Sequence, residues 1–206
     1  TRASSTGLLE DWTRRQNTAA LTQFEERALT VKQTPYPRFS EYTLDKRRIA
    51  EGDHPRIIAD TFGREATYLD YGAGPGHLVT LLREQGVSKI WAYDPAFEHD
   101  QTNPPFDVVI CREVIEHLAI GSVATVVADL VRQSARYVYL TTRFHPSPLS
   151  AFDVTDEHLV DPTHITCLDQ HLLRAMFVMH GMQRRADLED KLDHLKKWRV
   201  LVYEHI

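Results

Sequence analysis

The sequence predicts an α/β fold in which helices cover a mainly parallel sheet, and three observations support it. A β-forming segment at 67–71 runs through a glycine turn into a helical pattern at 77–82. Two further apolar segments, at 106–111 and 136–142, are separated by another helical pattern at 121–133. Strands that alternate with helices are typical of such sheets. A chain of 206 residues also has room for one domain with a sizeable core.

The glycine turn is the most specific feature of the sequence. Gly72, Gly74 and Gly76 stand at alternate positions shortly after Asp70 of the strand. Glycine permits a positive φ and lets a ligand approach without meeting a Cβ atom. The free N–H groups of the following helix face the same point, so we expect the turn to bind a nucleotide-like ligand. A dinucleotide fingerprint, G-x-G-x-x-G, is disfavoured because His77 stands where its last glycine should be.

The pattern D-x-G-x-G-x-G, from Asp70 to Gly76, resembles the first motif of class I S-adenosylmethionine-dependent methyltransferases. The resemblance covers about residues 60–206 and implies a Rossmann-like sheet. It also implies that Asp94, at the end of the next strand, accepts charge-assisted hydrogen bonds from the ribose hydroxyls of the cofactor. The candidate residues for S-adenosyl-L-methionine binding are Asp70, Gly72, Ala73, Gly74, Gly76, Asp94, Cys111 and Glu113.

Residues 1–62 are predicted to form an N-terminal helical extension of a core at 63–206, the whole being one compact domain. The periodicity predicts an amphipathic helix over 8–31 and a second helix over 44–62, broken near 52–55. The connecting loop is rich in aromatic residues, which are interpreted as a lid over cofactor and substrate or, alternatively, as side chains that dock the helices onto the sheet. These aromatic residues are Tyr36, Phe39 and Tyr42.

The segment 95–105 is shorter than the family pattern requires. It has eleven residues with three prolines, whereas a crossover between parallel strands needs a dozen residues or more. We therefore expect the third strand of the family to be missing and the strand at 90–94 to form the edge of the sheet. The usual adenine contacts from that region would then be absent, and residues 99–103 are candidates to replace them.

The second half of the chain predicts the remaining elements. A loop over 143–168 is long enough to suggest a functional role, and we interpret it as the element that determines acceptor specificity. Asp169 is expected to cap the N-terminus of a helix that Gly181 closes. A weak strand at 182–188 and a strong one at 198–203 are expected to be antiparallel at the sheet edge.

A second group of candidate residues follows the strand at 106–111. If one helical turn begins at Glu113, then Glu116 and His117 share its face, and two carboxylates with an imidazole suit Mg²⁺, Mn²⁺ or Zn²⁺. The pattern E-x-x-E-H resembles two metal-using branches of the superfamily, the small-RNA 2′-O-methyltransferases and the O-methyltransferases of ubiquinone biosynthesis. Both branches place another histidine after the fifth strand, where His164 is the best match and His145 the second.

The alternative is a site without a metal. The same motif is similar to that of many metal-free methyltransferases, in which the glutamate lies near the amine of the cofactor. The catalytic candidates are then His117, His164 and His145, since an imidazole with a pKa near 6.5 suits a general base. Five further histidines are interpreted as surface or cap residues: His54, His171, His180, His194 and His205.

Composition narrows the expected partners. A net charge of −5 does not favour the phosphate backbone of a nucleic acid, although one basic face remains compatible with it. Two cysteines fit a reducing cytoplasm, and no apolar stretch or signal-peptide layout predicts a membrane or secretory segment. Cys111 also fits a small core residue of its apolar strand. The sequence does not predict the oligomeric state.

These observations together predict an S-adenosylmethionine-dependent methyltransferase that O-methylates a hydroxylated small molecule, either with a divalent metal or with a histidine as general base. One alternative is an RNA 2′-O-methyltransferase, which requires a basic groove built from residues such as Arg38, Lys46, Arg47, Arg48 and Arg143. Another is a protein that binds the cofactor for a purpose other than methyl transfer. The sequence does not identify the methyl acceptor.

Overall fold

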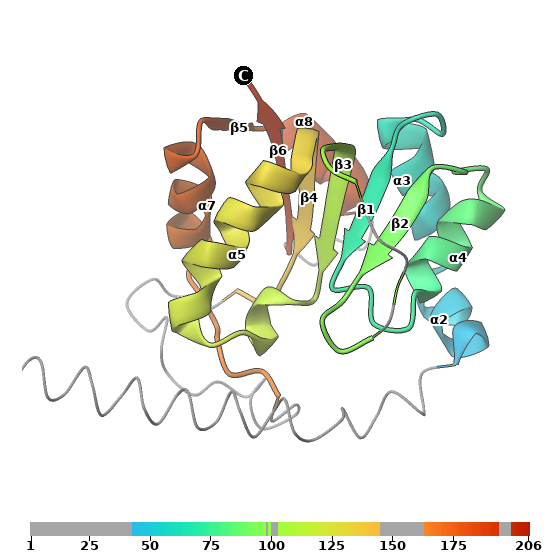
Figure 1. Ribbon diagram of the computed structural model, residues 1–206, viewed down its shortest axis with the longest axis horizontal. Helices are drawn as coiled ribbons and strands as arrows, with labels where there is room; N and C mark the ends of the chain where they lie inside the picture. The colour runs from blue at the N-terminus through green and yellow to red at the C-terminus, as the bar shows by residue number, and fades with distance from the viewer. Residues whose placement is uncertain (1–42, 98, 100–102, 145–162, 194–198) are drawn as a thin grey trace, which may run out of the picture. The chain divides into compact units, whose positions relative to one another are not determined.

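The computed structural model describes residues 43–97, 99, 103–144, 163–193 and 199–206. Its centre is a six-stranded sheet with the order β2-β1-β3-β4-β6-β5 (Figure 1). The strands are β1 (Tyr68–Tyr71), β2 (Ile90–Tyr93), β3 (Phe106–Arg112), β4 (Ser134–Thr141), β5 (Met182–Arg184) and β6 (Val200–His205). The predicted helix at 8–31 and the three aromatic residues of the proposed lid lie outside the described residues.

The strand directions confirm the Rossmann-like prediction. Neighbouring strands β2, β1, β3 and β4 are parallel, and β6 is antiparallel to both β4 and β5. In the described part of the chain no strand pairs with the outer side of β2, which agrees with the missing third strand predicted from the short segment 95–105. Asp70 therefore lies one strand away from the edge, beside Ala92 of β2.

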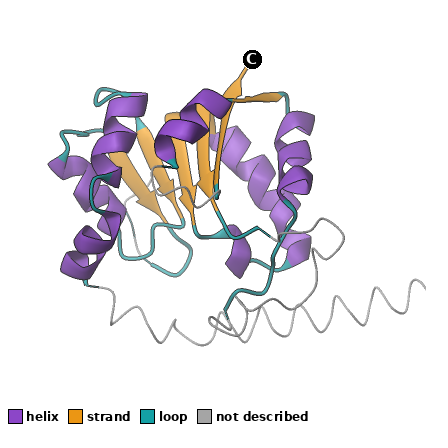
Figure 2. Ribbon diagram, turned by 180° about the vertical axis from the view of Figure 1, so that it is seen from behind, coloured by secondary structure: helices purple, strands orange, loops and turns teal. Residues whose placement is uncertain are grey.

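Helices cover both faces of this sheet, as Figures 1 and 2 show. The helices α5 and α7 pack on one face, where the core includes Leu69 and Val109; α3, α4 and α8 pack on the other, which includes Tyr68 and Val108. A parallel sheet buried on both faces needs apolar residues at consecutive positions, and β3 has them. The helices are α2 (Leu44–Glu51), α3 (His54–Phe62), α4 (His77–Glu84), α5 (Ile120–Gln133), α7 (Gln170–Met179) and α8 (Ala186–Leu192), with the short 3₁₀ helix η2 (Ile115–His117) after β3.

The break predicted near 52–55 separates α2 from α3. Gly52 ends α2 with φ 53°, and Pro55 stands in the first turn of α3, where its missing N–H costs no intrahelical bond. The hydroxyl of Thr43 accepts a hydrogen bond from the N–H of Lys46 and so caps α2. The two helices therefore meet at a sharp turn, and this turn brings Glu51 and His54 together.

The C-terminal third confirms the predicted cap of α7 and the antiparallel final strands, and it corrects the length of one strand. Asp169 caps α7 by accepting hydrogen bonds from the N–H groups of His171 and Leu172. The strand predicted over 182–188 is wrong beyond Arg184, because Ala186–Leu192 form the helix α8. Leu188 and Leu192, four positions apart, are both buried, as expected for one face of a helix. None of the described helices is long and apolar enough to span a membrane.

Candidate active site

The glycine turn connects β1 to α4 and has the backbone conformation predicted from its glycines. Gly72, Gly74 and Gly76 have φ values of 80°, 54° and 81°, a region that L-residues with a Cβ atom rarely adopt. Gly72 is also sterically confined, since an ideal Cβ atom there would lie 2.4 Å from Cγ2 of Val114. The turn therefore packs directly against the segment that carries Glu113 and Glu116.

Asp94 is bound to this turn through its carboxylate. One oxygen accepts a hydrogen bond from the N–H of Gly74 at 2.9 Å, and the other accepts one from Ala96 at 2.8 Å. The carbonyl of Tyr93 accepts from the N–H groups of Gly72 and Ala73, at 2.7 and 3.1 Å. The ends of β1 and β2 are thus fixed to each other, and the predicted cofactor residues Gly72, Ala73, Gly74 and Asp94 are brought together.

His99 lies over the same turn. Its Nε2 is 2.9 Å from the carbonyl oxygen of Gly74, and its Cε1 lies 4.0 Å from the position of an ideal Cβ on Gly76. Its ring stacks with that of Phe97 at a centroid distance of 6.3 Å. His99 belongs to the segment that the sequence offered as a replacement for the missing adenine contacts, and it is beside the predicted cofactor turn.

Asp70 and Cys111, two other cofactor candidates, project to opposite faces of the sheet. Asp70 is 4% exposed, and burial raises the pKa of its carboxyl to about 7, an effect that the positive charges of Arg112 and Arg47 oppose. Cys111 belongs to the apolar core on the α5 side, where burial raises the pKa of its thiol. Its side chain therefore packs in the core, as a small apolar residue would.

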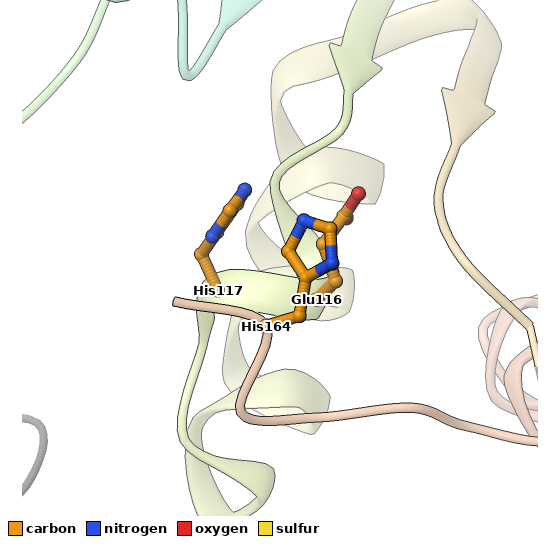
Figure 3. Close-up of side chains that lie close together, drawn as sticks. All are labelled: Glu116, His117 and His164. Carbon is orange, nitrogen blue, oxygen red and sulfur yellow. The ribbon is translucent and has the colours of Figure 1, made fainter. Parts of the chain in front are cut away.

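The segment after β3 departs from the single helical turn expected from Glu113 onward. Glu113 has a φ of 53°, and the 3₁₀ turn begins only at Ile115. One ligand atom each from Glu116, His117 and His164 lies within 4.8 Å of the others, and Figure 3 shows these side chains extending toward the same side. Glu113 lies outside this group, and its carboxylate is 3.3 Å from Nε of Arg143.

Hydrogen bonds hold Glu116, His117 and the segment that carries His164 in place. The hydroxyl of Thr142 donates to Oε2 of Glu116 at 2.7 Å. Nδ1 of His117 lies 3.1 Å from the carbonyl oxygen of Thr163 and 3.0 Å from its hydroxyl. The N–H of Ile165 donates to the carbonyl of Glu116 at 2.8 Å, so the 163–166 segment is attached to η2. The imidazole rings of His117 and His164 are 4.8 Å apart between centroids.

The two glutamates have opposite protonation tendencies. Glu116 is fully buried, and burial together with the negative charge of Glu113 raises its pKa to about 8. Burial also acts on Glu113, but a hydrogen bond with Glu116 and the charge of Arg143 lower its pKa. Without a bound cation, Glu116 therefore holds a proton near neutral pH, and its buried Oε1 accepts no hydrogen bond from the described residues.

Two predicted histidine positions have different outcomes. His145 lies outside the described residues. The interpretation of His54 as a surface or cap residue is wrong, because it is 6% exposed and its Nε2 is 2.9 Å from the hydroxyl of Tyr139. Its Nδ1 is 3.3 Å from Oε2 of Glu51, three positions earlier, and this E-x-x-H spacing was the available signal in the sequence.

Several solved structures have a similar arrangement of strands and helices. An S-adenosylmethionine-dependent methyltransferase from Archaeoglobus fulgidus has a TM-score of 0.56 and 12% identity, covering 82% of this chain and 97% of that one. The 1,6-didemethyltoxoflavin-N1-methyltransferase of Burkholderia thailandensis has a TM-score of 0.55 and 14% identity, with 88% and 89% covered. Magnesium protoporphyrin IX methyltransferase of Synechocystis PCC 6803 has a TM-score of 0.51 and 14% identity, covering 78% of this chain and 80% of that one. No curated protein sequence matches the chain.

The strand order and the glycine turn define a class I S-adenosylmethionine-dependent methyltransferase fold. A family model described as a methyltransferase domain matches residues 41–205, which is well over half of the chain. The chain belongs to this methyltransferase family, and the enzyme class predicted from the sequence is confirmed.

Proposed function

We propose that the protein transfers the methyl group of S-adenosylmethionine to a hydroxyl of a small molecule, and that Glu116, His117 and His164 hold a divalent cation that assists the reaction. The observation that carries this proposal is the convergence of their three ligand atoms within 4.8 Å. The ideal Cβ position of Gly72 lies 2.4 Å from Val114, so the glycine turn and the segment bearing two of these residues are in contact.

The cofactor part of the proposal rests on the turn and its two acids. The glycine turn lies against Asp94, whose carboxylate keeps lone pairs for ribose hydroxyls beyond the two hydrogen bonds that it accepts. We assign Asp70 to the cationic methionine end of the cofactor. The Synechocystis structure contains S-adenosylmethionine and the Burkholderia structure contains S-adenosylhomocysteine, which supports the same ligand for this fold.

The donor set fits a divalent cation. When Nδ1 of His117 donates to the carbonyl of Thr163, Nε2 is the ring nitrogen that can bind a cation. Glu116 contributes a carboxylate whose Oε2 is oriented by Thr142 and whose Oε1 accepts no hydrogen bond from the described residues. One carboxylate with two imidazoles suits Mn²⁺, Zn²⁺ or Fe²⁺ better than Mg²⁺, which prefers oxygen ligands. A bound cation supplies Lewis acidity, which lowers the pKa of an acceptor hydroxyl.

The chain's own groups then align the reactants and manage the proton. Methyl transfer requires the acceptor oxygen in line with the sulfonium at about 3 Å, which the fixed end of the sheet favours. If no cation is used, Nε2 of His117 is the group oriented to take the hydroxyl proton, because its Nδ1 already faces Thr163. The two versions differ in their response to a chelator.

The surroundings favour a small acceptor over RNA. Of the residues proposed for a basic groove, Arg47 pairs with Glu51 at 2.7 Å, Arg48 with Glu84 at 2.5 Å and Arg143 with Glu113 at 3.3 Å. A cation already paired with an acid offers little attraction to phosphate. The net charge of −5 acts in the same direction.

The test combines calorimetry with isotope transfer. We expect the purified protein to bind S-adenosylmethionine, and to transfer labelled methyl groups to hydroxylated small molecules in a cell extract, with activity lost in EDTA and regained with Mn²⁺ or Zn²⁺. Equal turnover with and without the chelator would rule out the cation, and failure to bind the cofactor would rule out methyl transfer. Label found in RNA, with binding that weakens steeply with salt, would overturn the small-molecule assignment.

A further inference from the structure

A second polar cluster lies under α2 and α3, on the opposite face of β3 from Cys111. It consists of Glu51, His54, Asp70, Arg112 and Tyr139, all buried or nearly so; the side chain of Arg112 is 11% exposed. Buried charges are costly unless they are paired, so a cluster of this kind needs an explanation. The proposed methyl-transfer chemistry uses only Asp70 from this group.

The sheet register explains why these side chains meet. Asp70 of β1 and Tyr139 of β4 are both register partners of Ile110 on β3, so all three project to one face. Arg112 is two positions after Ile110, and side chains alternate along a strand, so Arg112 projects to that face as well. The face is the one covered by α3, whose core includes Tyr68 and Ile58.

Arg112 joins this face of the sheet to the end of α2. Its Nη1 is 3.0 Å from Oε2 of Glu51, the last residue of α2. Glu51 also contacts Arg47 at 2.7 Å and His54 at 3.3 Å, and His54 continues to the hydroxyl of Tyr139 at 2.9 Å. Glu51 is buried, yet its contacts with His54 and Arg112 lower its pKa, so it remains an anion beside Arg112.

Asp70 depends on this arrangement for its charge. Burial disfavours the ionised carboxyl, and Arg112 is the largest opposing influence, followed by Arg47. The other charges that act on Asp70 are those of Glu51 and Asp94, both of which favour its neutral form. Loss of the Arg112 charge would leave a buried acid facing two anions with only Arg47 to balance them.

We propose that Arg112 is a positioning residue for cofactor binding: it lies on the same face of the sheet as Asp70 and favours its anionic form, while Glu51, which pairs with Arg112 at the end of α2, opposes that form. Together, Arg112 and Glu51 set the charge offered to the cationic methionine end of S-adenosylmethionine. The inference rests on the assignment of Asp70 to the cofactor under the proposed function. It adds that residues without contact to the ligand, on β3 and α2, determine the affinity and its dependence on pH.

The test measures S-adenosylmethionine affinity by calorimetry between pH 6 and 9.5 for the wild type, Arg112→Gln, Arg112→Lys and Glu51→Gln. Arg112→Gln raises the pKa of Asp70, so this variant should bind S-adenosylmethionine more weakly than the wild type at pH 7. Its affinity should still increase above pH 8, where the affinity of the wild type no longer changes with pH. Each unit of added pKa weakens binding below that pKa by about tenfold. Arg112→Lys should largely restore the profile. Glu51→Gln removes an anion and should shift the profile to lower pH.

Arg184→Gln is the matched control. Arg184 pairs with the buried Glu189 at 2.6 Å, on the far edge strand β5, so its loss also breaks a partly buried ion pair. We expect this variant to lose melting temperature while its affinity and pH profile stay unchanged. If Arg112→Gln and Glu51→Gln also lower the melting temperature without changing the affinity or its pH profile, Arg112 is only structural and the inference is overturned. If Arg112→Gln does not fold, the opposite profile shift of Glu51→Gln still decides. A wild type that does not bind the cofactor contradicts the proposed function instead.

Discussion

Replacement of Gly72 by alanine is expected to damage cofactor binding more than the same change at Gly181. The residue has φ 80°, and the new Cβ would lie 2.4 Å from Cγ2 of Val114. The left-handed conformation costs an L-residue about 1–2 kcal/mol, and overpacking of this kind costs about 1–3 kcal/mol more. For a chain of this size the total corresponds to a drop in melting temperature of roughly 4–20 °C.

Gly181 provides the matched control for this substitution. Its φ is 78°, and nothing lies within 4 Å of an ideal Cβ, so Gly181→Ala carries only the conformational cost. The difference between the two variants isolates the overlap with Val114. If the turn moves to relieve that overlap, the binding free energy of the cofactor becomes less favourable by the same amount, about 1–3 kcal/mol. Calorimetry should then show an affinity that is about 5- to 150-fold weaker.

Val114→Ala allows a stricter check through a double-mutant cycle. Removal of the two methyl groups costs about 1–2 kcal/mol by itself, but it clears the space that the methyl group introduced by Gly72→Ala would occupy, so the double variant should recover most of the overlap energy. We expect a favourable coupling of about 1–3 kcal/mol. The packing argument is refuted if the two changes are additive, or if Gly72→Ala binds the cofactor as the Gly181→Ala protein does.

Three further predictions concern the acids and the histidine around the turn. Glu116 has a raised pKa of about 8, so the cation-free protein should lose stability as pH rises from about 4.5 through 8. Glu116→Gln should remove that loss in melting experiments with EDTA, and it should also abolish the stabilisation by Mn²⁺. An unchanged dependence of melting temperature on pH would contradict the burial argument. Asp94→Asn should weaken S-adenosylmethionine and adenosine alike in calorimetry, and selective loss of methionine-end affinity would argue against a ribose role. His99→Ala should remove the contact with the Gly74 carbonyl and weaken cofactor binding, with little change in melting temperature. An unaltered affinity for the cofactor would exclude His99 from the site.

The sequence was sufficient for the features that local rules determine. The β1 strand, the positive φ values of Gly72 and Gly76, the cap at Asp169 and the missing strand after Asp94 all depend on residues close together in the chain. Helix α8 escaped prediction because it is short, begins within two residues of β5 and has only Leu188 and Leu192 to indicate its period. A three-residue strand followed by a short helix gives no clear periodicity of either kind.

The candidate site could be predicted only in part, because the position of one of its expected residues depends on tertiary contacts. Glu116 and His117 are adjacent in the sequence, and the pattern alone indicated them. Glu113 was expected to join them, but its positive φ is set by tertiary contacts, including the hydrogen bond from its N–H to Thr141 on the neighbouring strand at 2.8 Å. A non-glycine residue gives no local sign of that conformation.

Two different functions are proposed for the residues at and after the end of β3. Arg112 projects to the α3 face and contacts the end of α2, whereas the chain reverses at Glu113 and directs Glu116 and His117 toward His164. In the proposed function, the first direction sets the charge that the cofactor meets and the second acts on the acceptor hydroxyl. Changes at Arg112 should therefore act on cofactor affinity with turnover at saturation nearly unchanged, and changes at His117 should do the reverse. If both variants shift the same kinetic parameter, the roles of Arg112 and of the segment after β3 are not independent and this division of roles is wrong.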